Sequence, residues 1–198
     1  MHDTTRDRID ANAAGPGELE GEVAGSASPT ARAATSDDAA AIAAIYSEGI
    51  EDRIATFETR PRTTSDVAAW FDGRHPIVVV VDSAGAIVGF AATFEYRPRA
   101  AYARVAEFSV YVARAQRGRG IGRLAMTALI EAAAEAGLWK LISRVFVDNE
   151  ASRRLLADVG FREVGIYRRH GRLDGHWRDV VIVERLLPLA LEDNPSGS

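Results

Sequence analysis

A basic, glycine-rich segment at residues 110–123 carries the clearest chemical signal in the chain. Its sequence, VYVARAQRGRGIGR, is an apolar run that enters a turn with glycines at 118, 120 and 122, followed by a helical pattern from residue 121. Glycine allows successive backbone N–H groups to point at one anion, and the first turn of a helix adds N–H groups without an intrahelical partner. Positive charge around the turn comes from Arg114, Arg117, Arg119 and Arg123. The segment therefore predicts a site for a phosphate or pyrophosphate group.

The spacing of this turn excludes two common phosphate-binding motifs. A Walker A loop ends in Gly-Lys followed by Ser or Thr, whereas Gly122 is followed by Arg123 and Leu124. A dinucleotide-binding fingerprint lies in the first strand and helix of a parallel sheet, and several predicted strands precede this turn. The remaining pattern is Arg117-x-x-Gly120-x-Gly122.

Glu107 is the candidate proton acceptor. It lies in the mostly apolar run VAEFSVYV, residues 105–112, three residues before Val110. A partly buried carboxylate in such a segment can take a proton from a reacting group. From the residues alone, a solvated carboxylate on a strand is the simpler interpretation.

The pattern at residues 117–122 resembles the Gln/Arg-x-x-Gly-x-Gly/Ala signature of the GCN5-related N-acetyltransferases (GNAT), whose loop holds the pyrophosphate of acetyl-CoA. The run NEAS from Asn149, with Gly160 and Phe161 after it, is similar to the segment in which the family's asparagine contacts the pantetheine arm. The resemblance implies that acetyl-CoA is bound by Val110, Tyr111, Val112, Arg117, Gly118, Arg119, Gly120, Ile121, Gly122, Arg123 and Asn149.

The resemblance also implies the reaction, transfer of an acetyl group from the thioester of acetyl-CoA to an amine. Such an enzyme must supply geometry, a proton acceptor and a donor that polarises the thioester oxygen. The family favours Glu107 as the acceptor. It implies backbone amides of residues 110–112 as the donors, because family members separate this strand from its neighbour and bind pantetheine in the gap.

Three further runs resemble the phosphinothricin N-acetyltransferase branch, whose relatives include arsinothricin acetyltransferases: IATFETRP at 54–61, YRPRAAY at 96–102 and GHWRDV at 175–180. Substrates of that branch are small amino acids with a carboxylate and a second tetrahedral anion, which guanidinium groups bind in bidentate fashion. The resemblance implies that Arg97, Arg99 and Tyr102 bind the anion and that Thr56 and Phe57 form the substrate loop. A basic, solvent-exposed turn is the alternative for the arginines.

One position departs from the family. Leu156 stands five residues before Phe161, where the wider family has a tyrosine that protonates the leaving thiolate and the phosphinothricin enzymes have a histidine. Leucine cannot transfer a proton, so this role does not carry over. Either the thiolate leaves unassisted, or Tyr111 or another hydroxyl assists it.

Hydrophobic periodicity and turn residues predict the elements that must position these groups. Strands are predicted over 31–34, 77–81, 86–94, 102–112, 140–146, 161–169 and 177–186, and helices over 36–49, 65–73, 121–136 and 150–158. The resulting α/β (mixed α+β) chain matches the GNAT fold, in which a central mixed, mostly antiparallel sheet of about seven strands is splayed at the cofactor site and carries helices on both faces. The acetyltransferase domain is predicted over 30–188, with a flexible extension at 1–29 and a flexible tail at 189–198.

Composition bounds the remaining classes. A chain of 198 residues, 47% hydrophobic, is expected to form one core. The absence of cysteine excludes disulfides and a cysteine thiolate as nucleophile. The histidines, at 2, 75, 170 and 176, lack metal-ligand spacing, so no metal is expected. A formal charge of −4 gives no reason to expect nucleic acid. Apolar runs fall short of the roughly 20 residues that span a bilayer, and we expect a cytoplasmic protein with no membrane partner.

The residues and the resemblance leave three functions open. The first is acetylation of an arsinothricin-like or phosphinothricin-like amino acid, which would give resistance to an antibiotic or arsenical. The second is acetylation of another small amine or amino acid, such as methionine sulfoximine or methionine sulfone, or of a protein N-terminus. The third is a non-catalytic acetyl-CoA sensor. Arg97 and Arg99 argue against a peptide, and Glu107 argues against a sensor. The family resemblance also implies a homodimer.

Overall fold

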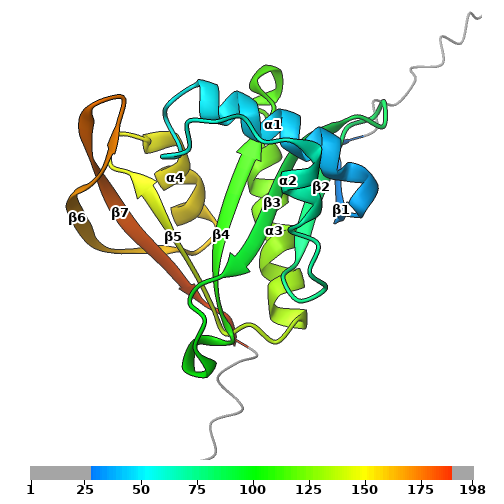
Figure 1. The fold of residues 1–198 in the computed structure, drawn as a ribbon. Helices are drawn as coiled ribbons and strands as arrows, with labels where there is room; N and C mark the ends of the chain where they lie inside the picture. Colours follow the sequence, from blue (N-terminus) through cyan, green and yellow to red (C-terminus); the bar gives the residue numbers. More distant parts are fainter. Residues whose placement is uncertain (1–27, 189–198) are drawn as a thin grey trace, which may run out of the picture.

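The computed structural model describes residues 28–188 (Figure 1). The predicted extension, except for residues 28 and 29, and the predicted tail lie outside the described residues. The elements in chain order are β1 (Thr30–Ala33), a 3-10 turn (Ser36–Asp38), α1 (Ala39–Glu51), α2 (Thr64–Ala68), β2 (Ile77–Val81), β3 (Ile87–Glu95), a 3-10 turn (Ala100–Tyr102), β4 (Val105–Val112), a 3-10 turn (Arg114–Gln116), α3 (Ile121–Glu135), β5 (Lys140–Phe146), α4 (Glu150–Asp158), β6 (Arg162–Leu173) and β7 (His176–Leu186).

The strands form one sheet in the order β1-β2-β3-β4-β5-β7-β6. Every neighbouring pair is antiparallel except β4 and β5, which are parallel. This confirms the predicted mixed, mostly antiparallel sheet. The one parallel pair needs a crossover, and α3 supplies it.

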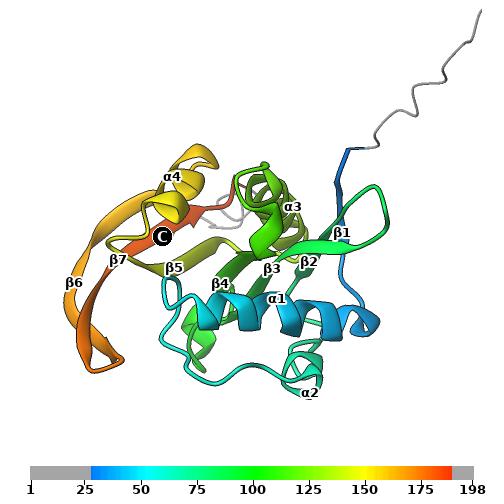
Figure 2. The same cartoon turned by 90° about the horizontal axis from the view of Figure 1, so that it is seen from above.

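Helices cover both faces of the sheet, as predicted (Figure 2). β2 shows how the sequence produces this arrangement, because successive side chains of a strand point to opposite faces. Ile77 and Val79 join the apolar cluster under α1 and α2, while Val78 and Val80 join the cluster under α3 and α4. A β-branched run buried on both sides therefore holds the two helical layers to one sheet. Within residues 28–188, no helix combines the length and apolar character that crossing a membrane requires.

β4 and β5 separate soon after they begin. Their register contains Val105 with Lys140, Ala106 with Leu141 and Glu107 with Ile142, and the pairing stops there although both strands continue. Beyond that point β4 remains paired with β3, and β5 with β7. The divergence in Figure 1 is the predicted splay, and it leaves one edge of β4 without a neighbouring strand.

Several predicted elements have different bounds in the structure. The strand predicted from residue 102 begins at Val105, because residues 100–102 form a 3-10 turn instead. The helix predicted over 65–73 ends at Ala68. The final hairpin has longer strands than predicted, since β6 runs to Leu173 and β7 begins at His176. Backbone pairing along the hairpin thus overrides the loop signal of Gly171 and Gly175.

The start of α1 depends on the buried carboxylate of Asp38. Its oxygens accept hydrogen bonds from Arg32 Nη1 and Nη2 at 2.7 and 2.8 Å and from the Thr35 N–H at 2.8 Å. The hydrogen bonds from Arg32 are the main reason that the pKa of Asp38 falls from its ordinary value of 3.8 to about 2. The pair joins β1 to α1, so the ionised carboxylate stabilises the folded state.

We expect Asp38→Asn to lower the free energy of unfolding at pH 7 by about 1–2 kcal/mol. A carboxylate whose pKa is lower in the folded state contributes stability above its unfolded pKa and loses it as the pH falls. The wild-type protein should therefore lose this contribution between pH 3.8 and about pH 2, and the variant should lack that part of the pH dependence. Urea unfolding at a series of pH values measures both effects.

Asp37→Asn is the matched control, because Asp37 is exposed and has no ion pair in the described structure. Equal stability losses in the two variants would contradict a specific role for the Arg32–Asp38 pair.

Candidate active site

The turn between β4 and α3 has the backbone conformation that the glycine pattern predicts. Gly118 and Gly120 have φ values of 75° and 81°, in the left-handed region that favours glycine, and Gly120 is the N-cap of α3. A Cβ on either residue would meet nothing within 4 Å, so backbone conformation and not space selects glycine here. The N–H groups of the first turn of α3 lack intrahelical acceptors. The turn therefore has the backbone geometry expected of an anion site.

The free edge of β4 extends this donor array along the strand. The Ala113 N–H donates to the Val88 carbonyl at 2.9 Å, and Tyr111 pairs with β3. Backbone groups alternate in direction along a strand. The N–H groups of Val110 and Val112 therefore point away from β3, toward the gap between β4 and β5. Val110 and Val112 therefore present backbone donors to the gap. Tyr111 lies between them in the strand and directs its side chain to the face of the sheet that carries α1.

Two of the four arginines around the turn are bound to the end of α1. Arg114 Nη2 and Arg117 Nη1 contact the Asp52 carboxylate at 2.8 and 2.6 Å, and Arg117 Nε donates to the Val112 carbonyl at 3.2 Å. Burial raises the pKa of Asp52, but the two guanidinium groups outweigh it, and the pKa lies below its ordinary value. These arginines fix the turn against α1.

The other two arginines also have protein partners. Arg123 Nη2 contacts the Asp158 carboxylate of α4 at 2.6 Å, and Arg119 Nη1 donates to Gln116 Oε1 at 3.1 Å. The predicted anion binding at this turn would therefore fall chiefly to the backbone amides. The basic side chains predicted from the sequence act first as supports of the turn.

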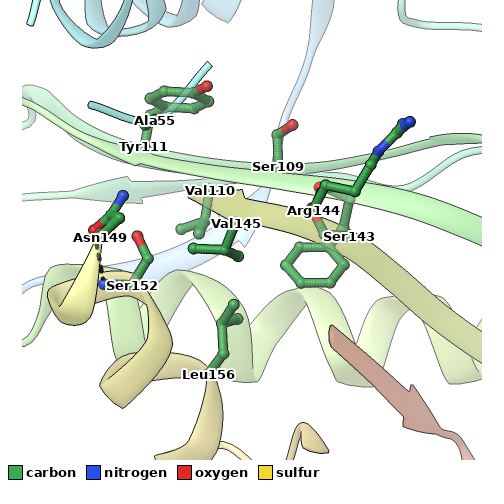
Figure 3. A pocket seen from close by; sticks show the side chains of 11 residues that line it. Ala55, Ser109, Val110, Tyr111, Ser143, Arg144, Val145, Asn149, Ser152 and Leu156 are labelled. Atoms are coloured by element: carbon green, nitrogen blue, oxygen red, sulfur yellow. Dashed lines mark hydrogen bonds between the residues drawn. The ribbon is translucent and has the colours of Figure 1, made fainter. Parts of the chain in front are cut away.

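Asn149 joins two segments that border the gap. It is the N-cap of α4, where its Oδ1 accepts from the Ser152 N–H at 3.1 Å, the hydrogen bond drawn in Figure 3. Its Nδ2 donates to the Ile54 carbonyl at 3.1 Å. The loop after α1 is thereby tied to the start of α4 across the opening between β4 and β5.

A groove follows this edge from the glycine turn to the gap, with a volume of about 390 Å³. Its lining includes the turn residues Arg117, Gly118, Gly120, Ile121, Gly122 and Arg123, together with Val110, Tyr111, Val112 and Asn149. Ten of the eleven residues predicted to bind acetyl-CoA therefore line one groove, and Arg119 lies outside its lining. That these residues bind acetyl-CoA stays a prediction. The groove shows that ten of them surround one continuous space.

Leu156 lies in the core below the gap. Its side chain is 2% exposed and packs in the apolar cluster with Phe108, and in Figure 3 it points up toward Val145. The hydroxyl of Ser152, one turn earlier in α4, lines the gap and the groove. The position that carries a proton donor in the wider family is here part of the hydrophobic core.

A second cavity, of about 410 Å³, opens on the face of the sheet that carries α1. Odd-numbered residues of β4 point to this face, and Figure 3 shows Ser109 and Tyr111 directed away from Leu156. The lining comprises Tyr46, Ala55, Thr56, Phe57, Glu58, Glu107, Ser109, Tyr111, Ser143, Arg144, Phe146 and His170. Ala55 and Tyr111 also line the groove, so cavity and groove meet at the separation of β4 and β5.

Glu107 lies in this cavity as an ion pair with Arg144 of β5. The Arg144 Nη2 donates to Glu107 Oε1, and the two side chains are 45% and 28% exposed. Sequence reasoning predicted the partial burial of Glu107 but missed Arg144. The only signal was a charged residue within the apolar run LISRVF, and its partner depends on the register of β4 and β5.

Tyr111 is held as a neutral phenol. Its ring stacks on Phe90 at 5.6 Å and lies 4.6 Å from the ring of Tyr46. Burial, and then the neighbouring Tyr46, raise the pKa of Tyr111 well above its ordinary value. Gly49 of α1 permits this packing, because a Cβ there would lie 2.5 Å from the Tyr111 ring.

The structure divides the predicted substrate residues into two groups. Thr56 and Phe57 line the cavity, and Phe57 packs edge-on against Phe146 at 4.9 Å. Arg97, Arg99 and Tyr102 lie outside the cavity lining, in the exposed connection between β3 and β4. There the Arg97 guanidinium lies 5.3 Å from the centre of the Tyr96 ring.

The site as a whole presents backbone donors for an anion beside an acidic cavity, and among residues 28–188 no cluster of side chains has the composition of a metal site. A long ligand with a pyrophosphate can lie along the groove and place its far end at the gap, where Glu107 can take a proton from a second molecule. The fold and the site thus place a groove for a long anionic ligand beside a cavity for a second molecule.

Comparison with known proteins identifies the family. The model of the Acetyltransferase (GNAT) family matches residues 40–161, more than half of the chain. The chain belongs to this family, and it is an acetyl-CoA-dependent N-acetyltransferase.

Several relatives share nearly the full length of the domain. The chain is 36% identical to a phosphinothricin N-acetyltransferase of Streptomyces coelicolor, over 82% of this chain and 99% of the relative. It is 33% identical to an L-methionine sulfoximine/L-methionine sulfone acetyltransferase of Pseudomonas paraeruginosa, over 74% and 88% of the two chains. A phosphinothricin acetyltransferase of Sinorhizobium meliloti, solved in complex with acetyl-CoA, matches with a TM-score of 0.78 at 28% identity, covering 87% of this chain and 95% of that one.

We expect Gly120→Ala to weaken acetyl-CoA binding about tenfold to a hundredfold. Alanine is strained at a φ of 81°, and relaxation of the turn would misdirect at least one N–H group, where a hydrogen bond to a charged group contributes about 1.5–3 kcal/mol. Isothermal titration calorimetry with acetyl-CoA measures the affinity.

Gly85→Ala provides the control. Gly85 has a φ of 83° and equally open surroundings, but it lies in the β2–β3 hairpin turn, outside the groove lining. Both variants should lose similar thermal stability, and only Gly120→Ala should lose affinity. Unchanged affinity in Gly120→Ala would contradict a pyrophosphate site built from this backbone.

Proposed function

We propose that this enzyme acetylates the amino group of a small anionic amino acid of the phosphinothricin or arsinothricin type. The observation that carries the proposal is the acidic cavity that meets the cofactor groove at the end of the β4–β5 pairing, with Glu107 and a guanidinium group side by side in it. Acetylation removes the positive charge of the amine. A toxic amino acid that acts through this charge is thereby inactivated, and resistance to the antibiotic or arsenical follows.

In the proposed mechanism, Glu107 removes a proton from the substrate amine, directly or through a water molecule. Acetyl-CoA supplies an activated thioester. The amine lone pair forms the new N–C bond, the C–S bond breaks, and the coenzyme leaves as a thiolate. The proton that the new amide nitrogen loses goes to this thiolate or to solvent. The N–H groups of Val110 and Val112 point into the gap and would polarise the thioester oxygen.

We assign no side-chain acid to the departing thiolate. Leu156 cannot donate a proton, and the Tyr111 phenol packs under α1 between Tyr46 and Phe90. A thiol has a pKa of about 8.5, so its thiolate is a competent leaving group near neutral pH and can take its proton from solvent. The Ser152 hydroxyl lines the gap and can support the thiolate through a hydrogen bond.

Arg97, Arg99 and Tyr102 retain a proposed role as ligands of the substrate's second anion. They lie outside the cavity lining, so this role requires the β3–β4 connection to approach the bound substrate or a second copy of the chain to complete the pocket. A homodimer is part of the proposal for this reason. A cytoplasmic location agrees with an enzyme that uses acetyl-CoA.

The second candidate is an enzyme for methionine sulfoximine and methionine sulfone. The relative from Pseudomonas paraeruginosa supports it, and both compounds carry a tetrahedral polar group in place of the phosphinate. Acetylation of a protein N-terminus remains a distinct alternative within the same chemistry, and acetyl-CoA sensing without turnover is opposed by the position of Glu107.

A panel of acceptors tests the substrate assignment. We expect release of free thiol from acetyl-CoA with phosphinothricin and arsinothricin, slower release with methionine sulfoximine, and little with glutamate. An Arg97→Ala, Arg99→Ala double variant should lose most of the activity with the first two. Turnover confined to methionine sulfoximine would favour the second candidate, and turnover confined to a peptide would overturn both.

We expect Glu107→Gln to lower kcat by about 10²- to 10⁴-fold, because glutamine cannot accept the amine proton. Acetyl-CoA affinity should stay within twofold of the wild-type value, since Glu107 lies outside the groove lining. Glu95→Gln is the matched control, at the exposed end of β3. A Glu107→Gln variant with wild-type kcat would contradict the assignment of Glu107 as the proton acceptor.

A further inference from the structure

Arg144 lies in the cavity that also holds Glu107, which we call the acceptor cavity. The proposed mechanism does not yet use this arginine. It lines both the cavity and the gap between β4 and β5. Arg144 lies two residues beyond Ile142, which is in register with Glu107, so the two charged side chains stand on the same face of neighbouring strands. Figure 3 shows the Arg144 side chain on the same side as Ser109 and Tyr111, away from Leu156.

The pair leaves hydrogen-bonding capacity on both of its members. Arg144 contacts Glu107 through one guanidinium nitrogen and one carboxylate oxygen. Within the described part of the chain, Nε and Nη1 of Arg144 and Oε2 of Glu107 make no hydrogen bond to protein. With 45% and 28% of their side chains exposed, both groups are open to a ligand in the cavity.

A free α-amino acid carries the complementary arrangement. Its ammonium and carboxylate groups are bonded to the same carbon, so they lie as close together as the two side chains of the ion pair. An ammonium group donates to a carboxylate, and a guanidinium group donates two hydrogen bonds to one carboxylate. When the amino acid lies antiparallel to the Glu107–Arg144 ion pair, its ammonium group faces Glu107 and its carboxylate faces Arg144. Both protein groups then gain a hydrogen-bond partner.

We propose that Arg144 binds the α-carboxylate of the substrate while Glu107 receives its amino group, so that the enzyme selects free α-amino acids. This inference rests on the proposed function and narrows its substrate class. Arg144 is then a specificity-determining residue that brings the amine to the proton acceptor. The transfer itself is unchanged: Glu107 takes one proton from the ammonium group, the N–C bond forms, the C–S bond breaks, and the second proton of the nitrogen goes to the departing thiolate or to solvent.

The side chain of the amino acid would point away from the pair. Phe57, Phe146 and His170 line the same cavity, and the ring centres of Phe57 and His170 lie 6.2 Å apart. Specificity for the substrate's second polar group is thereby separated from recognition of its amino-acid end. A peptide N-terminus fails at Arg144, because its α-carboxyl group is an uncharged amide.

The test compares methionine sulfone with its α-carboxamide and with its decarboxylated amine, 3-(methylsulfonyl)propylamine. The three acceptors differ only at the α-carboxyl group. For the wild-type enzyme we expect a kcat/KM about 10- to 100-fold higher for the amino acid, the range of one charge-assisted contact. Arg144→Gln should bring the three values close together, chiefly by raising KM for the amino acid, and Arg144→Lys should retain part of the preference.

The carboxamide also reports whether Glu107 is damaged in the variant. It needs the proton acceptor but not the charge of Arg144, so its kcat/KM should fall much less in Arg144→Gln than that of the amino acid. Acetyl-CoA titration and thermal unfolding confirm that each variant is folded. Arg154→Gln is the matched control, since Arg154 is 78% exposed and pairs within α4 with Glu150.

The outcomes separate this inference from the proposed function. Equal turnover of all three acceptors by the wild-type enzyme would overturn the role of Arg144 and leave amino-acid acetylation standing. Equal losses for all three in Arg144→Gln would also overturn it, because the residue would then serve structure or Glu107. A wild-type enzyme that acetylates peptides but no free amino acid would overturn both proposals.

Discussion

The early end of the β4–β5 pairing is the constraint on which the rest of the site depends. A sheet normally uses both edges of every internal strand, and β4 gives up one edge after Glu107. Its backbone donors then become available to a ligand. At this point of the strand, Glu107 and Arg144 meet on the face of the sheet that carries α1, and Leu156 fills the core on the opposite face. A continuous parallel pair would close the groove and separate the two ligand spaces.

The surrounding elements maintain this separation of strands. The Ser143 hydroxyl donates to the Phe108 carbonyl at 2.9 Å, just where direct pairing ends. Asn149 holds the loop after α1 across the opening, and Asp52 holds the glycine turn through two arginines. Unpaired backbone is costly inside a protein, and these contacts replace part of what the missing ladder would have supplied.

Local patterns in the sequence were sufficient to predict the order and type of the elements and the glycine conformation of the turn between β4 and α3. The apolar run before the turn, the glycine spacing and the helical period after it are contiguous, so they predict the pyrophosphate site directly. The acceptor cavity is different, because its groups come from distant segments. Arg144 meets Glu107 only through the register of a parallel pair, and Asn149 meets Ile54 across 95 residues of sequence. The charged loop at residues 96–102 matched a family pattern, yet its arginines lie outside the lining of the cavity in the single chain.

The left-handed conformation of Gly118 and Gly120 has a consequence for how this enzyme can evolve. Because the proposed anion site consists mainly of backbone amides, we expect few side chains around the turn to be irreplaceable for binding the coenzyme. Neighbouring residues can drift as long as these two positions keep their backbone freedom and the turn keeps its supports. The acceptor cavity has no such protection, since its chemistry depends on individual side chains. Divergence among descendants of this scaffold should therefore change the acceptor while the acyl donor stays the same.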